Sequence, residues 1–312
     1  MTLAYFSHAD CRAHVMGDGH PECPERLDAI QDHLIATGLL DALDLRDAPL
    51  ATAEQLERAH TASHVRETRD VIEPLRVTGE HHRFDPDTSA GPGTWQAALR
   101  AAGAAVAATD AVIDGNASAA FCAVRPPGHH ATRDQAMGFC FFNNVAVAAR
   151  HALDVRGLKR VAIIDFDVHH GNGTEDIVAG DERILMASFF QHPLYPYSGA
   201  VPKGTNMINV PIPPYARGPQ VREAIEAMWL PRLEEFRPQM IFVSAGFDAH
   251  REDELGQLGL VEADYAWITR QLVDVAARHA QGRIVSCLEG GYALSALARS
   301  VAAHLRVLGG LG

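Results

Sequence analysis

The chain has 312 residues, of which 47% are hydrophobic and 21% are charged, and it carries a formal net charge of −12 at pH 7. This composition is ordinary for a soluble globular protein with a large core. The acidic balance and the lack of any run rich in Lys or Arg argue against nucleic acid and membrane surfaces as partners.

The N-terminus resembles neither a membrane anchor nor a signal peptide. No apolar run approaches the roughly 18 residues of a membrane span. The segment Met1–Phe6 is followed directly by His8, Asp10 and Arg12, where a signal peptide would continue its apolar core. We therefore expect a cytoplasmic protein. The five cysteines form no CxxC pair, so we expect reduced thiols rather than a disulfide framework or a thiolate zinc site.

Short apolar runs alternate along the chain with longer helical patterns, which is typical of a parallel sheet with helices on both faces. The expected strands are Leu3–Phe6, Ala119–Val124, Arg160–Phe166, Ile184–Ser188, Met240–Ala245 and Arg283–Leu288. The expected helices are Pro24–Ala36, Thr94–Ile113, Asn143–Leu153, Pro219–Phe236, Glu262–Ala280 and Leu294–Leu308. We predict an α/β fold: a single three-layer domain over residues 1–312 with a mostly parallel central sheet.

The third expected strand leads into three side chains that suit a metal ion. Asp165, Asp167 and His169 occupy alternate positions, so they share one face if the strand geometry continues. Burying two carboxylates this close together is costly unless a cation binds them. The pattern therefore favours a metal site beyond the carboxyl end of the strand, where open α/β sheets bind ligands. The alternative is a solvated loop.

Three more expected strands end in residues suited to catalysis. The second leads into Arg125-Pro-Pro-Gly-His129-His130, and adjacent imidazoles suit proton transfer, although surface histidines are common. The fifth leads into Asp248, a third carboxylate at a strand end. The sixth leads into Glu289-Gly-Gly-Tyr292, where two glycines allow the backbone close to a ligand. The alternative for this last motif is a turn before a helix, with a packed tyrosine.

Together, five motifs in this order resemble the zinc-dependent histone deacetylase superfamily, which includes acetoin-utilisation-type proteins and acetylpolyamine amidohydrolases. The motifs are Arg125-Pro-Pro-Gly-His-His, Gly138-Phe-Cys-Phe-Phe-Asn-Asn, Asp165-Phe-Asp-Val-His-His-Gly-Asn-Gly-Thr, Ala245-Gly-Phe-Asp-Ala-His and Glu289-Gly-Gly-Tyr. The resemblance extends from His20 to Tyr292, and Asn172 and Phe247 are more similar to the class II branch. It implies an arginase/deacetylase-like fold.

The resemblance implies that Asp167, His169 and Asp248 bind one catalytic zinc ion. Three protein ligands of this type, with one position left open for water and substrate, are how catalytic zinc is held. The same ligands accept iron, so the sequence leaves the metal used in the cell open.

The resemblance also implies the groups that move protons. It assigns His129 and His130 as buried imidazoles, and we choose His130 as the general acid and base. Asp165 then orients His129, and Asn172 orients His130. Because an amide replaces a carboxylate there, His130 should be less basic than His129. Tyr292 matches the phenol that donates a hydrogen bond to the oxyanion.

A narrow substrate channel is implied as well. Phe139 and Tyr195 match its two aromatic walls, next to Gly138, although both aromatic residues could instead belong to the core. Leu255 falls where the polyamine-selective branch of the superfamily has an acidic residue, which favours acyl-lysine over a polyamine. Glu254 replaces the proline usual at its position and puts a carboxylate one residue away.

Finally, the resemblance implies one or two structural potassium ions in cages of oxygen atoms. The first site would use the Asp165 carboxylate, the Ser188 hydroxyl and the carbonyl groups of Asp167, His169 and Phe189. The second would lie around Val178, Asp181, Ile184 and Asn206. Arg26 either lines an inner passage for acetate release or lies on a helix surface.

We expect zinc-dependent hydrolysis of N-acetylated amines, with acetyl-lysine in proteins or peptides as the first candidate substrate and acetylpolyamines or other small acylated amines as the alternative. An arginase-like ureohydrolase would need Asp-x-His-x-Asp, whereas Asp165 opens an Asp-x-Asp-x-His order. A non-catalytic acyl-lysine reader would keep the fold without the chemistry. The sequence leaves open the acyl length, whether histones are substrates, and the oligomeric state, including a homodimer.

Overall fold

A computed structural model describes residues 2–311, and its centre is an eight-stranded sheet in the order β2-β1-β5-β10-β9-β6-β7-β8. Every pairing in this sheet is parallel. The strands are β1 (Leu3–Ser7), β2 (Asp44–Asp47), β5 (Ala119–Cys122), β6 (Val161–Asp165), β7 (Ile184–Gln191), β8 (Met207–Ile212), β9 (Ile241–Ala245) and β10 (Ile284–Leu288). The prediction of a mostly parallel sheet is confirmed.

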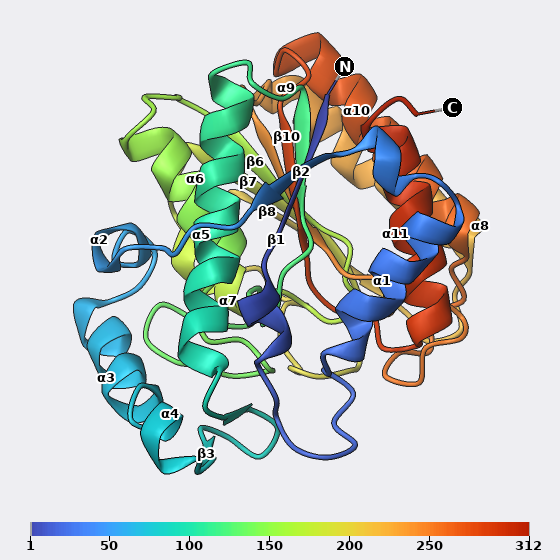
Figure 1. The fold of residues 1–312 in the computed structure, drawn as a ribbon. Coiled ribbons are helices and arrows are strands. Elements are labelled where there is room, and N and C mark those ends of the chain that lie inside the picture. Colours follow the sequence, from blue (N-terminus) through green and yellow to red (C-terminus); the bar gives the residue numbers. More distant parts are fainter. Residues whose placement is uncertain (1, 312) are drawn as a thin grey trace.

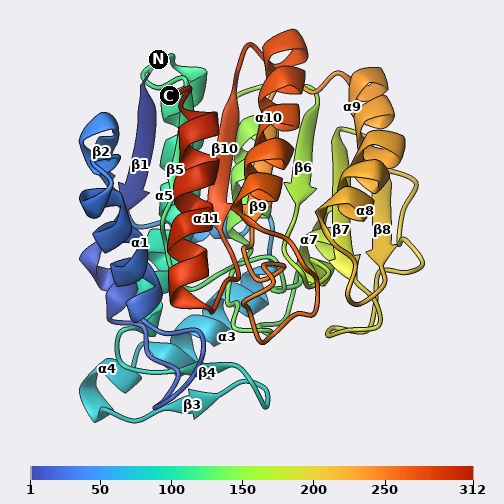
Figure 2. The same ribbon diagram turned by 90° about the vertical axis from the view of Figure 1, so that its right-hand side faces the viewer.

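Helices cover both faces of the sheet, which completes the expected three layers (Figure 1, Figure 2). One face carries α1 (Glu25–Ala36), α8 (Gly218–Ala224), α9 (Leu230–Phe236), α10 (Glu262–His279) and α11 (Leu294–Leu308). The other carries α5 (Thr94–Ile113), α6 (Asn144–Asp154) and α7 (Asn172–Val178). Between residues 2 and 311, no helix combines the length and apolar character needed to cross a membrane.

Small elements surround this framework. They are the 3-10 turns η1 (Ala9–Arg12) and η2 (Leu40–Ala42), the helices α2 (Ala53–Leu56), α3 (Ala62–Ile72) and α4 (Leu75–Thr78), and the antiparallel pair β3 (His82–Arg83) and β4 (Ser89–Ala90). In Figure 1, α3, α4 and β3 lie at the lower left, beyond the end of the sheet to which the strands point.

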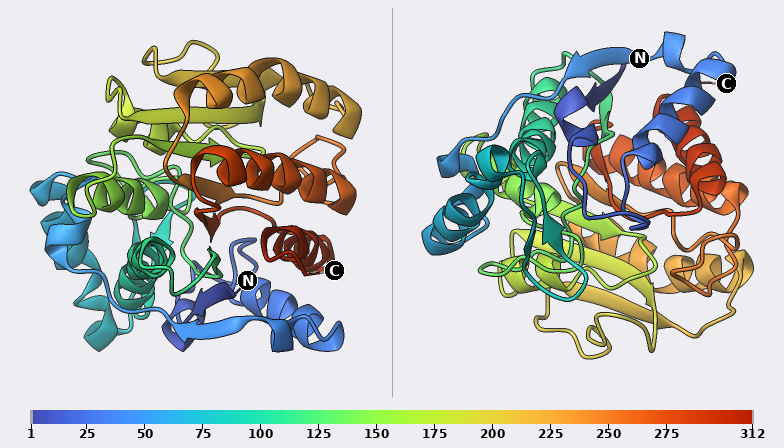
Figure 3. Two further views of the ribbon diagram at one scale, coloured as in Figure 1. Left: turned by 90° about the horizontal axis from the view of Figure 1, so that it is seen from above. Right: turned by 60° about the horizontal axis from the view of Figure 1, so that its bottom comes forward.

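All eight strands point the same way, so their carboxyl ends form one edge of the sheet (Figure 2). The right-hand view of Figure 3 brings this edge forward, whereas both chain ends lie toward the opposite edge. Because β9 pairs with β6, and β6 in turn with β7, the loops after these strands start side by side. The predicted site residues therefore converge at the carboxyl edge.

Candidate active site

The three predicted metal ligands converge from two neighbouring strands. Asp167 and His169 follow β6, and Asp248 follows β9. One ligand atom from each residue lies within 4.8 Å of the others. The Nδ1 atom of His169 is 3.1 Å from Asp167 Oδ1 and 3.1 Å from Asp248 Oδ2. Both carboxylates are fully buried.

This donor set fits a zinc ion. Ligands held at 2.0–2.1 Å by tetrahedral zinc lie about 3.3 Å from one another, close to the separations found here. Burial and the neighbouring Asp167 raise the pKa of Asp248 to about 7. Burial lowers the pKa of His169, but the Asp167 and Asp248 carboxylates, which accept hydrogen bonds from its ring, outweigh burial and raise this pKa to about 10. A bound cation relieves such crowding of buried carboxylates.

Backbone amides and glycines fix the two carboxylates in place. The Gly290 N–H donates to Asp167 Oδ2 at 2.8 Å, and the Val168 N–H donates to Asp248 Oδ1 at 2.8 Å. A Cβ atom at Gly290 would collide with Asp248, and one at Gly246 would collide with Asp167. Glycine is therefore required at both positions, since any side chain there would occupy the space of a carboxylate.

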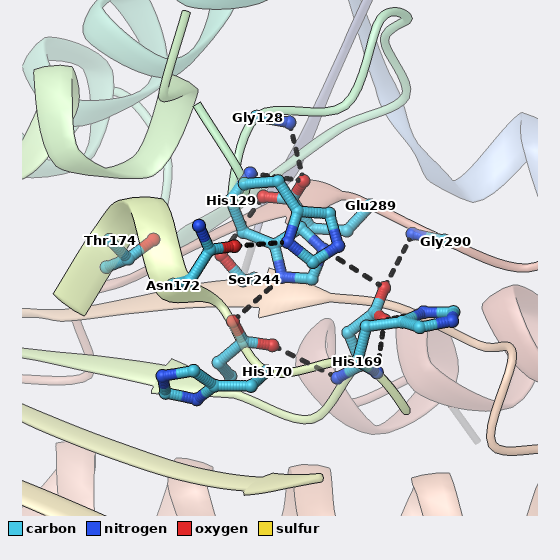
Figure 4. A network of polar contacts seen from close by, with 12 residues as sticks. Gly128, His129, His169, His170, Asn172, Thr174, Ser244, Glu289 and Gly290 are labelled. Atoms are coloured by element: carbon cyan, nitrogen blue, oxygen red, sulfur yellow. Dashed lines mark hydrogen bonds and ion pairs between the residues drawn. The ribbon is translucent and has the colours of Figure 1, made fainter. Parts of the chain in front are cut away.

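Two histidines lie beside this cluster, each with a different partner (Figure 4). His129 Nδ1 is 3.0 Å from Asp165 Oδ2, and His130 Nδ1 is 2.7 Å from Asn172 Oδ1. The two ring centroids are 4.0 Å apart. These are the pairings expected from the sequence. Of the two imidazoles, His130 lines the cavity described below, so it is the one that a substrate can reach.

The different partners set the histidines apart in basicity. Burial lowers the pKa of His129, but the Asp167 and Asp165 carboxylates outweigh it and hold this pKa well above its usual value. Burial and the neighbouring His129 hold the pKa of His130 well below its usual value. The direction is the one expected from the sequence, but its causes are burial and the charge of His129, because the hydrogen bond to Asn172 by itself raises the pKa of His130. Since His130 lines the cavity and His129 does not, His130 is the imidazole placed to accept a proton from a bound water.

Glu289 has a role that the sequence did not indicate. Its Oε2 atom accepts the N–H groups of Gly128 at 2.7 Å and of His129 at 3.1 Å, while Ser244 Oγ donates to Oε1 at 3.0 Å (Figure 4). Burial raises its pKa to about 7. Glu289 therefore ties the end of β10 to the loop that carries both histidines. The sequence feature that could have indicated this role is the position of a carboxylate directly after an apolar strand.

A cavity of about 560 Å³ leads to His130 and His169. It is lined by the predicted catalytic residue Tyr292 and by the predicted channel residues Gly138, Phe139, Tyr195 and Leu255. The Tyr195 ring centroid lies 5.1 Å from that of His130, and the Phe139 centroid lies 6.0 Å from that of Tyr292. Both aromatic rings therefore line the channel, and Phe139 also packs against the hydrophobic core. Glu254 is exposed and is not part of this lining.

The turn that carries Tyr292 is anchored from two sides. Asp253 Oδ2 accepts the Tyr292 N–H at 2.6 Å, and Arg26 Nε donates to the Gly291 carbonyl at 2.7 Å. The Arg26 guanidinium also lies 5.0 Å from the centre of the Tyr292 ring. Arg26 is fully buried, so the alternative of a helix-surface arginine is wrong. Burial keeps the pKa of the Tyr292 phenol well above its usual value, so the hydroxyl stays protonated as a donor.

The mouth of the cavity has two residues that the sequence did not suggest. His20 and Asp87 line it, and the His20 ring centroid is 4.7 Å from that of Phe139. Asp85 Oδ1 accepts the N–H of Asp87 at 2.8 Å and so shapes the turn. No regular pattern marks this loop; the closely spaced acids Asp85 and Asp87 were the available signal.

The residues of the predicted potassium sites also meet. Ser188 lies opposite Asp165 in the β6–β7 register, and its buried hydroxyl has no hydrogen-bond partner among residues 2–311. An unpaired buried oxygen beside a carboxylate fits a hard cation. At the second site, Asn206 Nδ2 donates to the carbonyl groups of Val178, Ile184 and Asp181 at 2.9, 3.0 and 3.3 Å.

Comparison with known proteins agrees with this geometry. Residues 20–308 match the histone deacetylase domain, and the chain therefore belongs to the histone deacetylase family. It is 41% identical over 281 residues to the histone deacetylase-like amidohydrolase of Pseudomonas aeruginosa, covering 88% of this chain and 73% of that protein. It is 36% identical to a probable deacetylase of Archaeoglobus fulgidus, covering 94% and 82%.

A solved structure supports the same assignment. The crystal structure of the HDA15 HD domain matches with a TM-score of 0.90 at 33% identity, covering 99% of this chain and 90% of that one. The fold is thus arginase/deacetylase-like, as the sequence motifs implied.

Proposed function

We propose that this protein is a zinc-dependent deacetylase that hydrolyses the amide bond of N-acetylated amines, with acetyl-lysine in proteins or peptides as its main substrate. The observation that carries the proposal is a cluster of three metal donors, Asp167, His169 and Asp248, of which His169 lines the same cavity as His130 and Tyr292. Three donors of this type with room for water are typical of a hydrolytic zinc site rather than a structural one.

Asp167, His169 and Asp248 would hold the zinc ion, which supplies a polarising charge for the acetamide carbonyl and lowers the pKa of bound water to about 7. His130, whose imidazole is neutral and faces the cavity, takes the proton from the attacking water. The Tyr292 hydroxyl donates to the oxygen that becomes negative as the carbonyl is attacked. His130 then returns its proton to the amine that leaves, so the proton balance closes.

The remaining residues position these groups. Asp165 holds His129 as a cation, and Asn172 fixes the orientation of the His130 ring. A charged His129 beside His130 keeps the second imidazole neutral at the start of the reaction. We further propose that the protein binds one or two structural potassium ions and that residues 1–312 form a single catalytic domain.

The shape of the channel favours acyl-lysine. The rings of Phe139 and Tyr195 line its walls and Leu255 contributes an apolar side chain, so a four-carbon stem can be buried between them. The acetylpolyamine alternative is favoured by one observation: the Asp87 carboxylate at the mouth, which would attract the distal ammonium of a polyamine.

The test is to compare kcat/KM of the zinc-loaded protein on an acetyl-lysine peptide and on N-acetylputrescine, with Asp87→Asn as the informative variant. We expect the peptide to be preferred by about tenfold or more. Preference for acetylputrescine that disappears in Asp87→Asn would replace the first substrate with the alternative. Absence of turnover on both substrates would contradict the proposed function.

A further inference from the structure

Two exposed tyrosines lie beside the channel in a backbone conformation that bulky residues rarely adopt. Tyr197 has φ 60° and is 75% exposed, and Tyr215 has φ 67° and is 73% exposed. Aromatic residues at positive φ are uncommon and cluster at functional sites. A third such residue, Phe139, is already a channel wall. Tyr197 also lines the channel mouth, which leaves Tyr215 without an assigned role.

Tyr215 lines a second hollow of about 570 Å³, together with Arg217, Arg251 and Gln257. This second hollow adjoins the channel, because Leu255 lines the channel and Gln257, two residues later, lines the hollow. Two residues of fully extended chain span about 7 Å. A polypeptide substrate seated in the channel would therefore pass over the second hollow within a few residues.

Backbone hydrogen bonds make the second hollow a fixed part of the fold. The Tyr215 N–H donates to the Gln257 carbonyl at 2.9 Å, and the Gly259 N–H donates to the Ala216 carbonyl at 2.8 Å. On the other side, the Arg251 N–H donates to the Leu260 carbonyl at 2.9 Å. The segment 257–260 is thus held between the loops that carry the two arginines.

The charge of the second hollow differs from that of the chain as a whole. Arg217 and Arg251 are exposed, and in the described part of the chain neither guanidinium has an acidic partner, although the net charge is −12. The one carboxylate in the lining, Asp264, already accepts a hydrogen bond from Arg222 at 2.6 Å and one from the Val261 N–H at 3.0 Å. Two unpaired arginines in one concave site favour an anionic group.

We propose that the second hollow binds an acidic side chain of the substrate polypeptide, an Asp or Glu that lies about two to four residues from the acetyl-lysine in the channel. The site rests on the proposed function and narrows its substrate class to acetylated proteins with acidic residues near the modified lysine. Arg217 and Arg251 bind the carboxylate, and the Tyr215 ring supports the peptide chain beside it.

The test uses three substrates with the zinc-loaded enzyme at physiological salt: a capped acetyl-lysine amide, an acetyl-lysine peptide with Gln at the flanking positions, and the same peptide with Glu there. Wild type is compared with the double variant Arg217→Gln/Arg251→Gln. Arg237→Gln is the matched control, because Arg237 is exposed and precedes β9, at the opposite edge of the sheet. It removes one positive charge far from the second hollow, as each of the two substitutions in the double variant does within it.

We expect wild type to prefer the Glu peptide about fivefold, mainly through KM, since one exposed charge pair contributes about this factor. The double variant should lose this preference and Arg237→Gln should keep it, while turnover of the capped amide stays the same in all three proteins. Equal rates on both peptides in wild type, or loss of the preference in Arg237→Gln as well, would overturn the inference and leave the proposed function standing.

Failure of the proposed function gives a different result, namely no turnover of any substrate, including the capped amide. The inference is then judged by equilibrium binding of the two fluorescently labelled peptides to wild type and to the double variant. The inference is supported if wild type binds the Glu peptide more tightly than the Gln peptide and the double variant does not. Equal binding of both peptides overturns it.

Discussion

At the scale of single residues, the Tyr292 hydroxyl is the atom whose loss should separate catalysis from metal binding. It is a donor at the cavity and not a member of the metal cluster. We predict that Tyr292→Phe lowers kcat by about 10²–10³ and leaves zinc content, measured by mass spectrometry, unchanged. Tyr195→Phe is the matched control, because it removes the same atom from the opposite wall and should keep a rate near wild type.

A second prediction concerns His304, which is buried away from the active site. Thr269 Oγ1 lies 2.7 Å from its Nδ1 atom, and Ser286 Oγ lies 3.0 Å from its Nε2 atom. Thr269 Oγ1 also donates to the Tyr265 carbonyl, so it accepts the Nδ1 proton of His304. Burial lowers the pKa of His304 to about 3.

The sign of the resulting pH dependence follows from this shift. Below a pH of about 6.5, His304 binds a proton in the unfolded chain but not in the folded chain. The free energy of unfolding therefore falls as the pH drops toward 3. For His304 alone the loss between pH 7 and pH 5 is about 2 kcal/mol. Urea unfolding at both pH values should show a smaller difference in His304→Gln. An identical difference in variant and wild type would contradict this assignment.

The sequence predicts site residues well where local geometry places them. Asp167 and His169 lie within four residues of Asp165, the last residue of β6, so they fall at the carboxyl edge where open α/β sheets bind ligands, although the strand itself does not continue through them. The buried contacts of Arg26 and Glu289 could not be predicted, because they depend on how distant segments pack. Arg26 reaches the Gly291 carbonyl across 265 positions of sequence, and no local pattern encodes such a distance.

At the scale of elements, the alanine-rich helix α5 packs closely enough that one glycine is essential. Most alanines in α5 are buried, which agrees with the interpretation of the sequence. A Cβ atom at Gly103 would collide with the Pro49 carbonyl, and the Ala51 N–H donates to the Leu99 carbonyl in the same contact. Small residues on α5 therefore set its distance from the segment that precedes α2.

Gly103→Ala should accordingly destabilise the protein, although this change in a helix normally stabilises by about 1 kcal/mol. We predict a loss of about 1–3 kcal/mol in the free energy of unfolding, as for other overpacked positions. Urea denaturation measures it. Ala107→Gly, at a partly exposed position of the same helix, is the control and should cost about 1 kcal/mol. A more stable Gly103→Ala variant would show that the contact is loose.

All six predicted strands and all six predicted helices occur, and the two strands of the eight-stranded sheet that the sequence missed, β2 and β8, lie at its edges. The sequence also missed the small pair β3 and β4 and the short helices α2, α3, α4 and α7. β2 has alternating partial exposure and the polar sequence Asp-Leu-Arg-Asp, while β8 contains Asn209 and Pro211. Neither has the continuous apolar run of a central strand. The predicted helix Pro219–Phe236 is interrupted by a π turn at Ile225–Trp229, just before Pro231, which has no N–H to donate.

At the scale of the whole molecule, the proposed zinc site would link stability to function. Removal of a bound cation would leave the buried Asp167 and Asp248 carboxylates without its compensating charge. We predict that a chelator lowers the free energy of unfolding by about 4 kcal/mol, as expected for a ligand present at a thousand times its dissociation constant. Zinc should restore the loss, and Asp248→Ala should abolish the response. If a chelator leaves the urea midpoint unchanged, no metal is bound by this cluster.

The most direct test of a zinc-dependent deacetylase is to titrate zinc into the metal-free protein while measuring turnover of an acetyl-lysine peptide. We predict that activity rises in proportion to zinc and stops rising at about one ion per chain, because Asp167, His169 and Asp248 form a single catalytic zinc site. We also predict that the Asp248→Ala variant stays inactive at every zinc concentration. Full activity without added metal, or an Asp248→Ala variant that turns over the peptide, would contradict zinc-dependent catalysis at this site.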